Sequence, residues 1–155
     1  MSFNQQAVLA LFNDVVSDIQ TLGVFETVNQ HEPKSAPQNG FVASVWMDAI
    51  DPVGRASGIA ATSGVVTLMC RCYSSMLLQP VDNIDPGLMT AVAAVLNVFS
   101  TGYSLSGSVR DVDLLGMYGK SLSAQAGYIS IDNKMFRVVT ITIPVVINDM
   151  FIQEA

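Results

Sequence analysis

Two cysteines lie one residue apart in the stretch TLMCRCYSS, and they are the first candidates for chemistry in this sequence. Cys70, Cys72 and the single histidine, His31, are the only soft or imidazole ligands that the chain offers to a metal. A structural zinc site needs four such ligands, so these residues would leave it short even if the fold brought all of them together. The sequence therefore argues against a transition-metal site.

A reactive thiol is the second chemical hypothesis for this stretch. A nucleophilic cysteine needs a nearby base, and His31 lies in a proline-bearing segment, with no glycine-rich elbow near either thiol. On one strand, Cys70 and Cys72 are separated by about two residue rises and point the same way, which is at the long limit for a disulfide. We predict instead that both are small apolar side chains packed under a helix.

Arg71, between the two thiols, is the only charged residue between Arg55 and Asp82. On a strand it lies on the face opposite the thiols, together with Met69 and Tyr73. One interpretation is that this face contacts another subunit, because arginine beside aromatic and methionine side chains is common at interfaces. The other is that Arg71 lies along its own sheet with its charged end in water. The sequence leaves both open.

The carboxylates do not form a recognisable acidic site. They occur as spaced pairs, Asp48 and Asp51, Asp82 and Asp85, and Asp111 and Asp113. Only the last pair shares a strand face, and a calcium loop or a paired-acid site needs further partners. No phosphate-binding glycine loop, G-x-S-x-G elbow or H-E-x-x-H motif occurs. We therefore assign no catalytic residue, cofactor or metal, and expect no enzyme.

The size and charge of the chain narrow its class. It has 155 residues, enough for one domain with its own core. Charged residues make up 13% of the chain, against roughly a quarter in typical soluble domains. Either other subunits cover part of the surface, or uncharged polar side chains do. The net charge of −6 is opposite to what gripping nucleic-acid phosphates requires, but it is compatible with DNA sliding past.

The sequence shows no targeting signal. The start, MSFNQQAVLALFNDVV, lacks the basic residues and cleavage site of a signal peptide. No run of about 18 apolar residues would form a membrane-spanning helix. We therefore expect the protein to stay in the cytoplasm of the cell that makes it, with reduced cysteines and no membrane contact.

Two amphipathic helices are predicted. Apolar residues at helical spacing predict the first over residues 2–22, with Ser2 and Gln5 as a capping box. The second lies in DPGLMTAVAAVLNVFSTG, with Asp85 as N-cap and Pro86 in the first helical position. Its body has no charged side chain, which indicates that it is covered on more than one side.

The rest of the chain alternates as strands do. Strands are predicted at residues 41–49 and 65–77 and in SVRDVDLLGMY, and SAQAGYISI and MFRVVTITIPVVI form a hairpin around residues 132–134. Pro144 cannot donate to a strand ladder, which predicts an edge or a strand end. The order of elements predicts a single α+β domain over residues 1–155, with both helices packed on a largely antiparallel sheet.

One connection is longer than a tight turn requires. The segment IDPVGRASGIAATSG, residues 50–64, is rich in small residues and carries the lone Arg55. It is either a floppy hairpin tip or an extended arm that orders against a neighbouring subunit.

Together these segments resemble the tail terminator proteins of long-tailed bacteriophages. The resemblance covers nearly the full length, and its carriers are the capped N-terminal helix, the proline-bearing loop, and the segments GFVASVWMDAI, GRASGIAATSG, VVTLMCRCYSS, DPGLMTAVAAVLNVF and FRVVTITIPVVIND. It is a resemblance of architecture, because the family has no catalytic signature to match. No functional residue is carried over from the family.

The resemblance implies a structural virion protein at the head–tail junction. Such proteins form a ring, typically a hexamer, on the head-proximal end of the tail tube, where they stop tube polymerisation and dock the head connector. DNA passes through the lumen of the ring without specific binding. The candidate subunit contacts that we take from the sequence are Arg55, Arg71, Tyr73, Arg110 and Asp111.

Three other functions stay open. The chain could be another neck or tail component, either a head–tail joining protein or a tube subunit that polymerises without closing. It could be a monomeric module that binds a small ligand or peptide in a deep apolar pocket. A cysteine-dependent hydrolase would require Cys70 or Cys72 to be exposed and rapidly alkylated at neutral pH.

Overall fold

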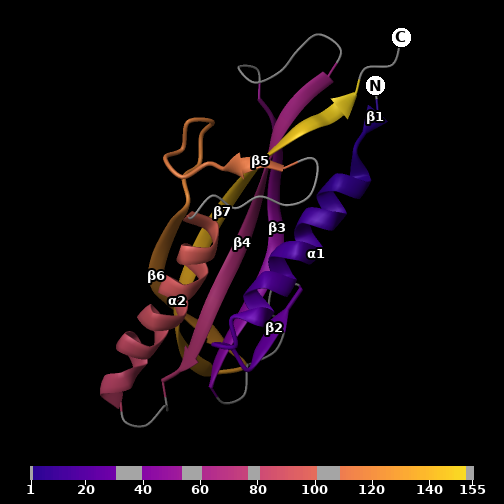
Figure 1. Ribbon diagram of the computed structural model, residues 1–155. Coiled ribbons are helices and arrows are strands. Elements are labelled where there is room, and N and C mark those ends of the chain that lie inside the picture. Colours follow the sequence, from indigo (N-terminus) through magenta and orange to yellow (C-terminus); the bar gives the residue numbers. More distant parts are fainter. Residues whose placement is uncertain (1, 31–39, 54–60, 77–80, 101–108, 153–155) are drawn as a thin grey trace.

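The computed structural model describes residues 2–30, 40–53, 61–76, 81–100 and 109–152 (Figure 1). Its described strands form one seven-stranded sheet in the order β1-β7-β4-β3-β2, with β5 and β6 also paired to β7. The bounds are β1 Ser2–Phe3, β2 Thr27–Asn29, β3 Phe41–Pro52, β4 Ala61–Ser75, β5 Val109–Val112, β6 Ser123–Ile131 and β7 Lys134–Ile152. Every pair is antiparallel except β2 with β3.

Two helices, α1 Gln5–Thr21 and α2 Ile84–Ser100, lie on the same face of this sheet (Figure 1). Their apolar stripes enter one continuous core, in which Leu11, Ile19, Leu88 and Phe99 are buried against side chains of β3, β4 and β7. Each fully buried side chain of this kind stabilises the fold by roughly 1.5–3 kcal/mol. The predicted α+β class, with helices on a largely antiparallel sheet, is confirmed.

β4 is the strand that carries the cysteines, and its two faces differ as predicted. Leu68, Cys70 and Cys72 point toward the helices and are buried in the main core. Met69 and Arg71 alternate with them and point to the other side. We call this other side of the sheet, away from α1 and α2, the Arg71 face.

The first helix begins later than the sequence analysis predicts. Ser2 and Phe3 pair with the end of β7 as strand β1, so Ser2 does not cap the helix. Asn4 is the N-cap instead, and its side-chain oxygen accepts a hydrogen bond from the Ala7 amide at 3.2 Å. The predicted capping box is therefore wrong, because pairing with β7 keeps the chain extended up to residue 3.

The second helix begins earlier than predicted. A 3₁₀ turn over Val81–Asn83 leads directly into Ile84, so Asp85 lies in the first turn of α2 and is not its N-cap. The carboxylate of Asp85 accepts a hydrogen bond from Arg137 of β7 instead. The side chain that the sequence pattern assigned to the N-cap therefore makes a tertiary contact instead.

β7 is the central strand, and Pro144 lies in its middle, where it is buried. The prediction of an edge or strand end at Pro144 is wrong. Along one side of β7, β6 pairs as far as Thr142 and β5 pairs from Val145, so Pro144 falls between the two partners. Its carbonyl accepts from the Asp113 amide on that side, so its missing N–H points to the same break in the ladder.

The β6–β7 hairpin has the tightest turn of the sheet. Ile131 and Lys134 pair directly, so the turn contains only Asp132 and Asn133, with φ of 52° and 63°. Positive φ at both positions gives a two-residue turn whose twist matches the strands. The predicted hairpin is confirmed, although Lys134 belongs to β7 and not to the turn.

Both ends of the segment 50–64, for which a hairpin tip and an extended arm were open, belong to paired strands, and the choice between the two stays a prediction. β3 continues to Pro52 and β4 begins at Ala61, and the two remain paired up to Pro52 and Gly64. Residues 54–60, including Arg55, lie outside the described residues. The short strand β2 is missed by the sequence analysis, because three residues are too few for an alternating pattern.

The cap of α1 generates a stability prediction. Asn4→Ala removes the acceptor for the Ala7 amide, so the free energy of unfolding should fall by about 1 kcal/mol, as measured by urea denaturation. Asn13→Ala is the matched control, because Asn13 is exposed within the same helix. Equal stability of wild type and Asn4→Ala would show that Asn4 is not the cap.

Candidate functional site

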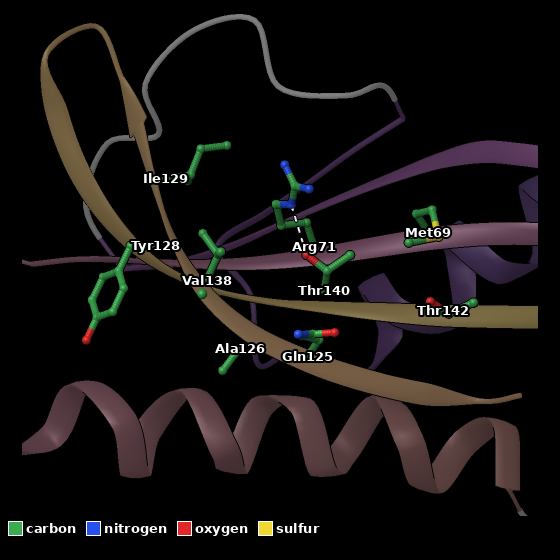
Figure 2. Close-up of a pocket in the computed structure, with 10 residues that line it drawn as sticks. Met69, Arg71, Gln125, Ala126, Tyr128, Ile129, Val138, Thr140 and Thr142 are labelled. Atoms are coloured by element: carbon green, nitrogen blue, oxygen red, sulfur yellow. Dashed lines mark hydrogen bonds between the residues drawn. The ribbon is translucent and has the colours of Figure 1, made fainter.

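Arg71, which the sequence analysis singled out, makes two contacts on the Arg71 face. Arg71 Nε donates a hydrogen bond to Thr140 Oγ1 of β7 at 3.0 Å (Figure 2). Its guanidinium carbon lies 5.2 Å from the ring centroid of Trp46 on β3. The side chain therefore lies along its own sheet, held by neighbours on both sides. A role of Arg71 in a subunit contact stays a prediction.

A hollow of about 380 Å³ opens beside Arg71 between β4, β7 and β6 (Figure 2). Its described lining is Met69, Arg71, Gln125, Ala126, Gly127, Tyr128, Ile129, Val138, Thr140 and Thr142. These residues include one cation, hydroxyl groups and one amide, but no carboxylate, thiol or imidazole. Such a set can hold a carboxylate or a backbone carbonyl, but it supplies no general base.

Tyr73, the second interface candidate on this face, is fully buried within the chain. Its ring meets Phe136 edge-on, with centroids 6.4 Å apart, in a small cluster with Val138. Ile129 and Ile131 of β6 pack against the same cluster. Tyr73 is therefore not available for the subunit contact that we predicted, because the β6–β7 hairpin covers it.

The other interface candidates are not brought together by the described structure. Arg55 lies outside the described residues, as do the side chains of Arg110 and Asp111. The backbone of both residues belongs to β5, where a register shift separates the pairs made by Val109 and Asp111. Their predicted subunit contacts stay predictions.

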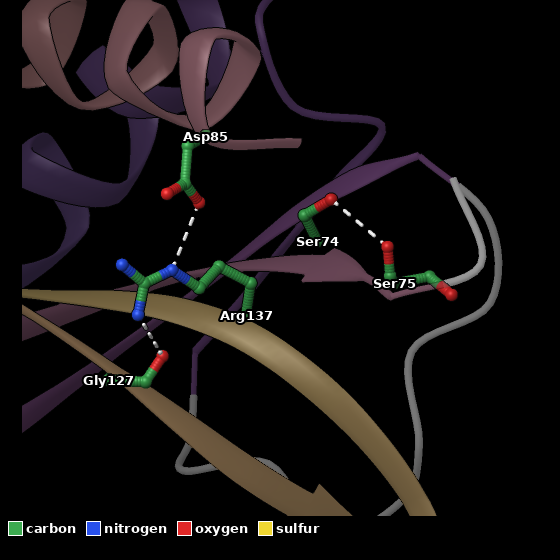
Figure 3. Close-up of polar contacts among 5 residues, drawn as sticks. All are labelled: Ser74, Ser75, Asp85, Gly127 and Arg137. Atoms are coloured by element: carbon green, nitrogen blue, oxygen red, sulfur yellow. Dashed lines mark hydrogen bonds and ion pairs between the residues drawn. The ribbon is translucent and has the colours of Figure 1, made fainter. Parts of the chain in front are cut away.

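Arg137 forms a polar link between α2 and the sheet (Figure 3). Its Nε donates to Asp85 Oδ1 in the first turn of α2 at 3.0 Å, and its Nη1 donates to the Gly127 carbonyl of β6 at 3.1 Å. The hydrogen bond to Asp85 raises the pKa of Arg137, which stays charged. The contact aligns α2 with the β6–β7 hairpin, a positioning role that sequence spacing does not show.

The two cysteines are core residues. Cys70 and Cys72 are unbridged and 0% exposed, which confirms the prediction that they pack under the helices. A hydrogen bond with Cys70 and burial both raise the pKa of the Cys72 thiol well above its ordinary value. Neither thiol has the exposure that a cysteine-dependent hydrolase requires.

Asp113 and the loop after it form a structural feature that the sequence analysis missed. The carboxylate of Asp113 is buried, and it accepts hydrogen bonds from the amides of Met117 and Tyr118, each at 2.9 Å. The strand predicted through SVRDVDLLGMY therefore ends at Val112, since Asp113 turns the chain. The glycines at 116 and 119, both with positive φ, were the available signal.

This turn leaves a short apolar segment in the solvent. We call residues 114–117, Leu-Leu-Gly-Met, the apolar loop. Leu115 is 88% exposed and Met117 is 73% exposed, and Leu114 is also exposed. Neighbouring exposed side chains of this size indicate a contact surface.

A second apolar surface opens beside the N-terminal half of α1. A groove of about 350 Å³, here called the α1 groove, lies between this helix and β3. Its described lining is Phe3, Gln5, Val8, Leu9, Phe12, Gln30, Trp46, Met47, Ile50 and Leu68, which includes no charged residue. Val8 belongs to the main core and Phe12 packs against it, and both also line this groove.

The described part of the chain contains neither a cluster of metal ligands nor a membrane-spanning helix. Within it, no group of three or more His, Cys, Asp or Glu side chains is placed to hold a metal ion. None of the helices described is long and apolar enough to cross a membrane.

The comparisons with known proteins identify a fold and no family. No protein-family description matches the chain, and no curated protein does. Among solved structures, the chain is similar to one in the virion of a native gene transfer agent particle, with a TM-score of 0.51 and 13% identity. The likeness covers 86% of this chain and 91% of that one. At this identity it shows a shared fold.

The burial of the thiols predicts slow labelling. In the native protein at neutral pH, a thiol reagent should react with Cys70 and Cys72 far more slowly than in denaturant, where both should react. Rapid labelling of either thiol in the native state would contradict this burial and support the cysteine-hydrolase hypothesis.

The raised pKa of Cys72 also predicts a pH effect with a definite sign. Above the ordinary thiol pKa the unfolded chain loses a proton that the folded chain keeps, so the free energy of unfolding should fall as the pH rises through this range. Cys72→Ala should show a weaker fall in urea titrations at increasing alkaline pH. Identical slopes would exclude this contribution.

Proposed function

We propose that this protein is a structural component of a phage-like virion, and more specifically a tail terminator. In this role it forms a ring on the head-proximal end of the tail tube, stops tube polymerisation and offers the docking surface for the head connector. DNA passes through the lumen. The partners are further copies of the chain, the tube protein and the connector.

One observation carries the proposal, namely the likeness in fold to a chain of the gene transfer agent virion. It covers most of both chains, so the whole fold is alike and not a single motif. That particle is a virion, so its chain is found in a packaged assembly. The sequence resemblance to tail terminator proteins of bacteriophages also indicates a virion assembly.

The surface of the described structure supports an assembled state. The apolar loop and the α1 groove are two uncharged apolar surfaces in solvent. The chain is low in charge, at 13%, and its net charge of −6 would repel DNA that passes through a lumen. These features suit a subunit of a ring better than an isolated monomer.

The competing functions differ in how copies of the chain associate. A tube subunit would add copies without closing, whereas a terminator closes its ring. A head–tail joining protein would bind the connector and not the tube end. The α1 groove also keeps a ligand-binding module in consideration, because its lining is almost wholly apolar.

The test is the mass of the purified protein by light scattering at rising concentration, alone and with tail tubes from its own particle. A closed oligomer, or a monomer that caps one end of the tubes, is expected. Open-ended polymers would contradict the proposal in favour of a tube subunit. A monomer that ignores the tubes would favour the ligand-binding module.

Arg71 gives a second prediction for the same assay. Arg71→Glu should stay folded, because the side chain is only partly buried, but it should block ring assembly or tail capping by reversing a charge beside the open hollow. Lys134→Glu is the matched control, as it makes the same charge change at an exposed position in the β6–β7 hairpin. Normal capping by a folded Arg71→Glu would remove Arg71 from the interface.

A further inference from the structure

The apolar loop is held in a fixed shape although its side chains are in solvent. Asp113 accepts the Met117 and Tyr118 amides, the Leu122 amide donates to the Asp113 carbonyl at 3.1 Å, and the Gly119 amide donates to the Gly116 carbonyl at 3.1 Å. The two side chains that protrude most, Leu115 and Met117, are therefore presented by an ordered turn. Little conformational entropy would be lost if they were bound.

The loop is anchored over the Arg71 face. Directly after it, Tyr118 packs on the cluster of Val53, Val65 and Val146, whose strand positions place them on that face. Two residues further, Lys120 forms an ion pair with Asp48 of β3, with 3.0 Å between Nζ and Oδ2. In Figure 1 the loop is the orange segment that projects between β5 and β6. Leu115 and Met117 point away from the sheet into solvent, as their exposure shows.

The α1 groove lies between α1 and the part of β3 beyond its pairing with β2, mainly on the helix-covered side of the sheet. Leu9 of α1 and Met47 of β3 lie at its rim and are 52% and 51% exposed, while Val8 and Leu68 lie deeper. Its volume of about 350 Å³ is at the lower end of the range for binding pockets, roughly 300–1,000 Å³, so a few side chains would fill it.

We propose that the apolar loop of one copy docks into the α1 groove of the next copy. The inference rests on the proposed ring-forming function and names the contact that would build the ring. A second copy fits because neither surface carries a charge, so docking would leave no ion buried without a partner. The charged groups beside these surfaces already have partners within one chain: Asp113 accepts two loop amides, Arg71 donates to Thr140, and Lys120 pairs with Asp48.

The placement of the two surfaces determines the symmetry. A two-fold dimer buries the same patch on both partners, whereas the loop is anchored over the Arg71 face and the groove lies beside α1, so the two do not form one patch. Each copy therefore uses two different surfaces, loop to one neighbour and groove to the other. Contacts of this head-to-tail type repeat from copy to copy and close into a ring when the rotation allows it.

The first test is covalent capture in a chain that carries both Leu9→Cys and Leu115→Cys. Mild oxidation of the oligomer, or of tube-bound protein if the free chain is monomeric, should give a ladder of cross-linked species. Each single variant should give no ladder, because neighbouring copies then lack one of the two thiols that the cross-link joins. The buried Cys70 and Cys72 can remain. Met89→Cys with Leu115→Cys is the matched control, because Met89 is 68% exposed on α2 and outside the groove.

The second test is assembly of Leu115→Asp, which should fold normally because Leu115 is almost fully exposed. The concentration at half-assembly should rise by roughly tenfold or more, as expected for loss of a central apolar anchor. Met89→Asp, the control, should assemble as the wild type does.

The outcomes separate this inference from the proposed function. A wild-type ring without a ladder, or an equal ladder in the Met89 control, would overturn the loop-in-groove contact and leave the ring in place. The same holds if Leu115→Asp loses tube capping but keeps its ring, since the loop would then contact the tube. A wild type that neither self-associates nor binds tubes would overturn both.

Discussion

The hydrogen-bond ladder of β7 is the constraint on which the rest of this structure depends. Over nineteen residues this strand has β4 along one side, and β6, β5 and β1 in succession along the other. Pro144 is tolerated in its buried middle because it faces the break between two of these partners. That break is also where Asp113 turns the chain, so the same constraint that accommodates the proline creates the apolar loop.

The two faces of the sheet are covered by different means, and the candidate surfaces follow from that difference. α1 and α2 both cover one face, where they bury Cys70 and Cys72 with the main core (Figure 1). Among the described residues, Tyr118 covers one end of the Arg71 face and the β6–β7 hairpin covers the other. The hollow at Arg71 lies between these parts. α1 in turn leaves the groove beside β3 open.

The proposed ring needs separate surfaces for neighbouring copies and for the tube, and the unequal faces of this sheet offer candidates for both. Rigid presentation would matter in such a ring, because an error in the angle of one interface is repeated at every interface. Asp113 fixes the apolar loop, and Arg137 fixes α2 against the β6–β7 hairpin (Figure 3). Both are buried or partly buried polar groups with their hydrogen bonds formed, which is how such groups specify one geometry.

The sequence by itself determined the class of fold, both helices, the strands β3, β4, β6 and β7, and the burial of the thiols. Those follow from the spacing of apolar residues, which local chain geometry converts directly into buried faces. It did not determine the helix caps. Ser2 is not an N-cap because it pairs with β7, and Asp85 is not one because the 3₁₀ turn extends the helix and its carboxylate binds Arg137. Nor did it show that Tyr73 would be covered while Leu115 stayed in solvent. Only the tertiary structure decided these, because exposure depends on which distant segments pack over a residue, and no local pattern records that.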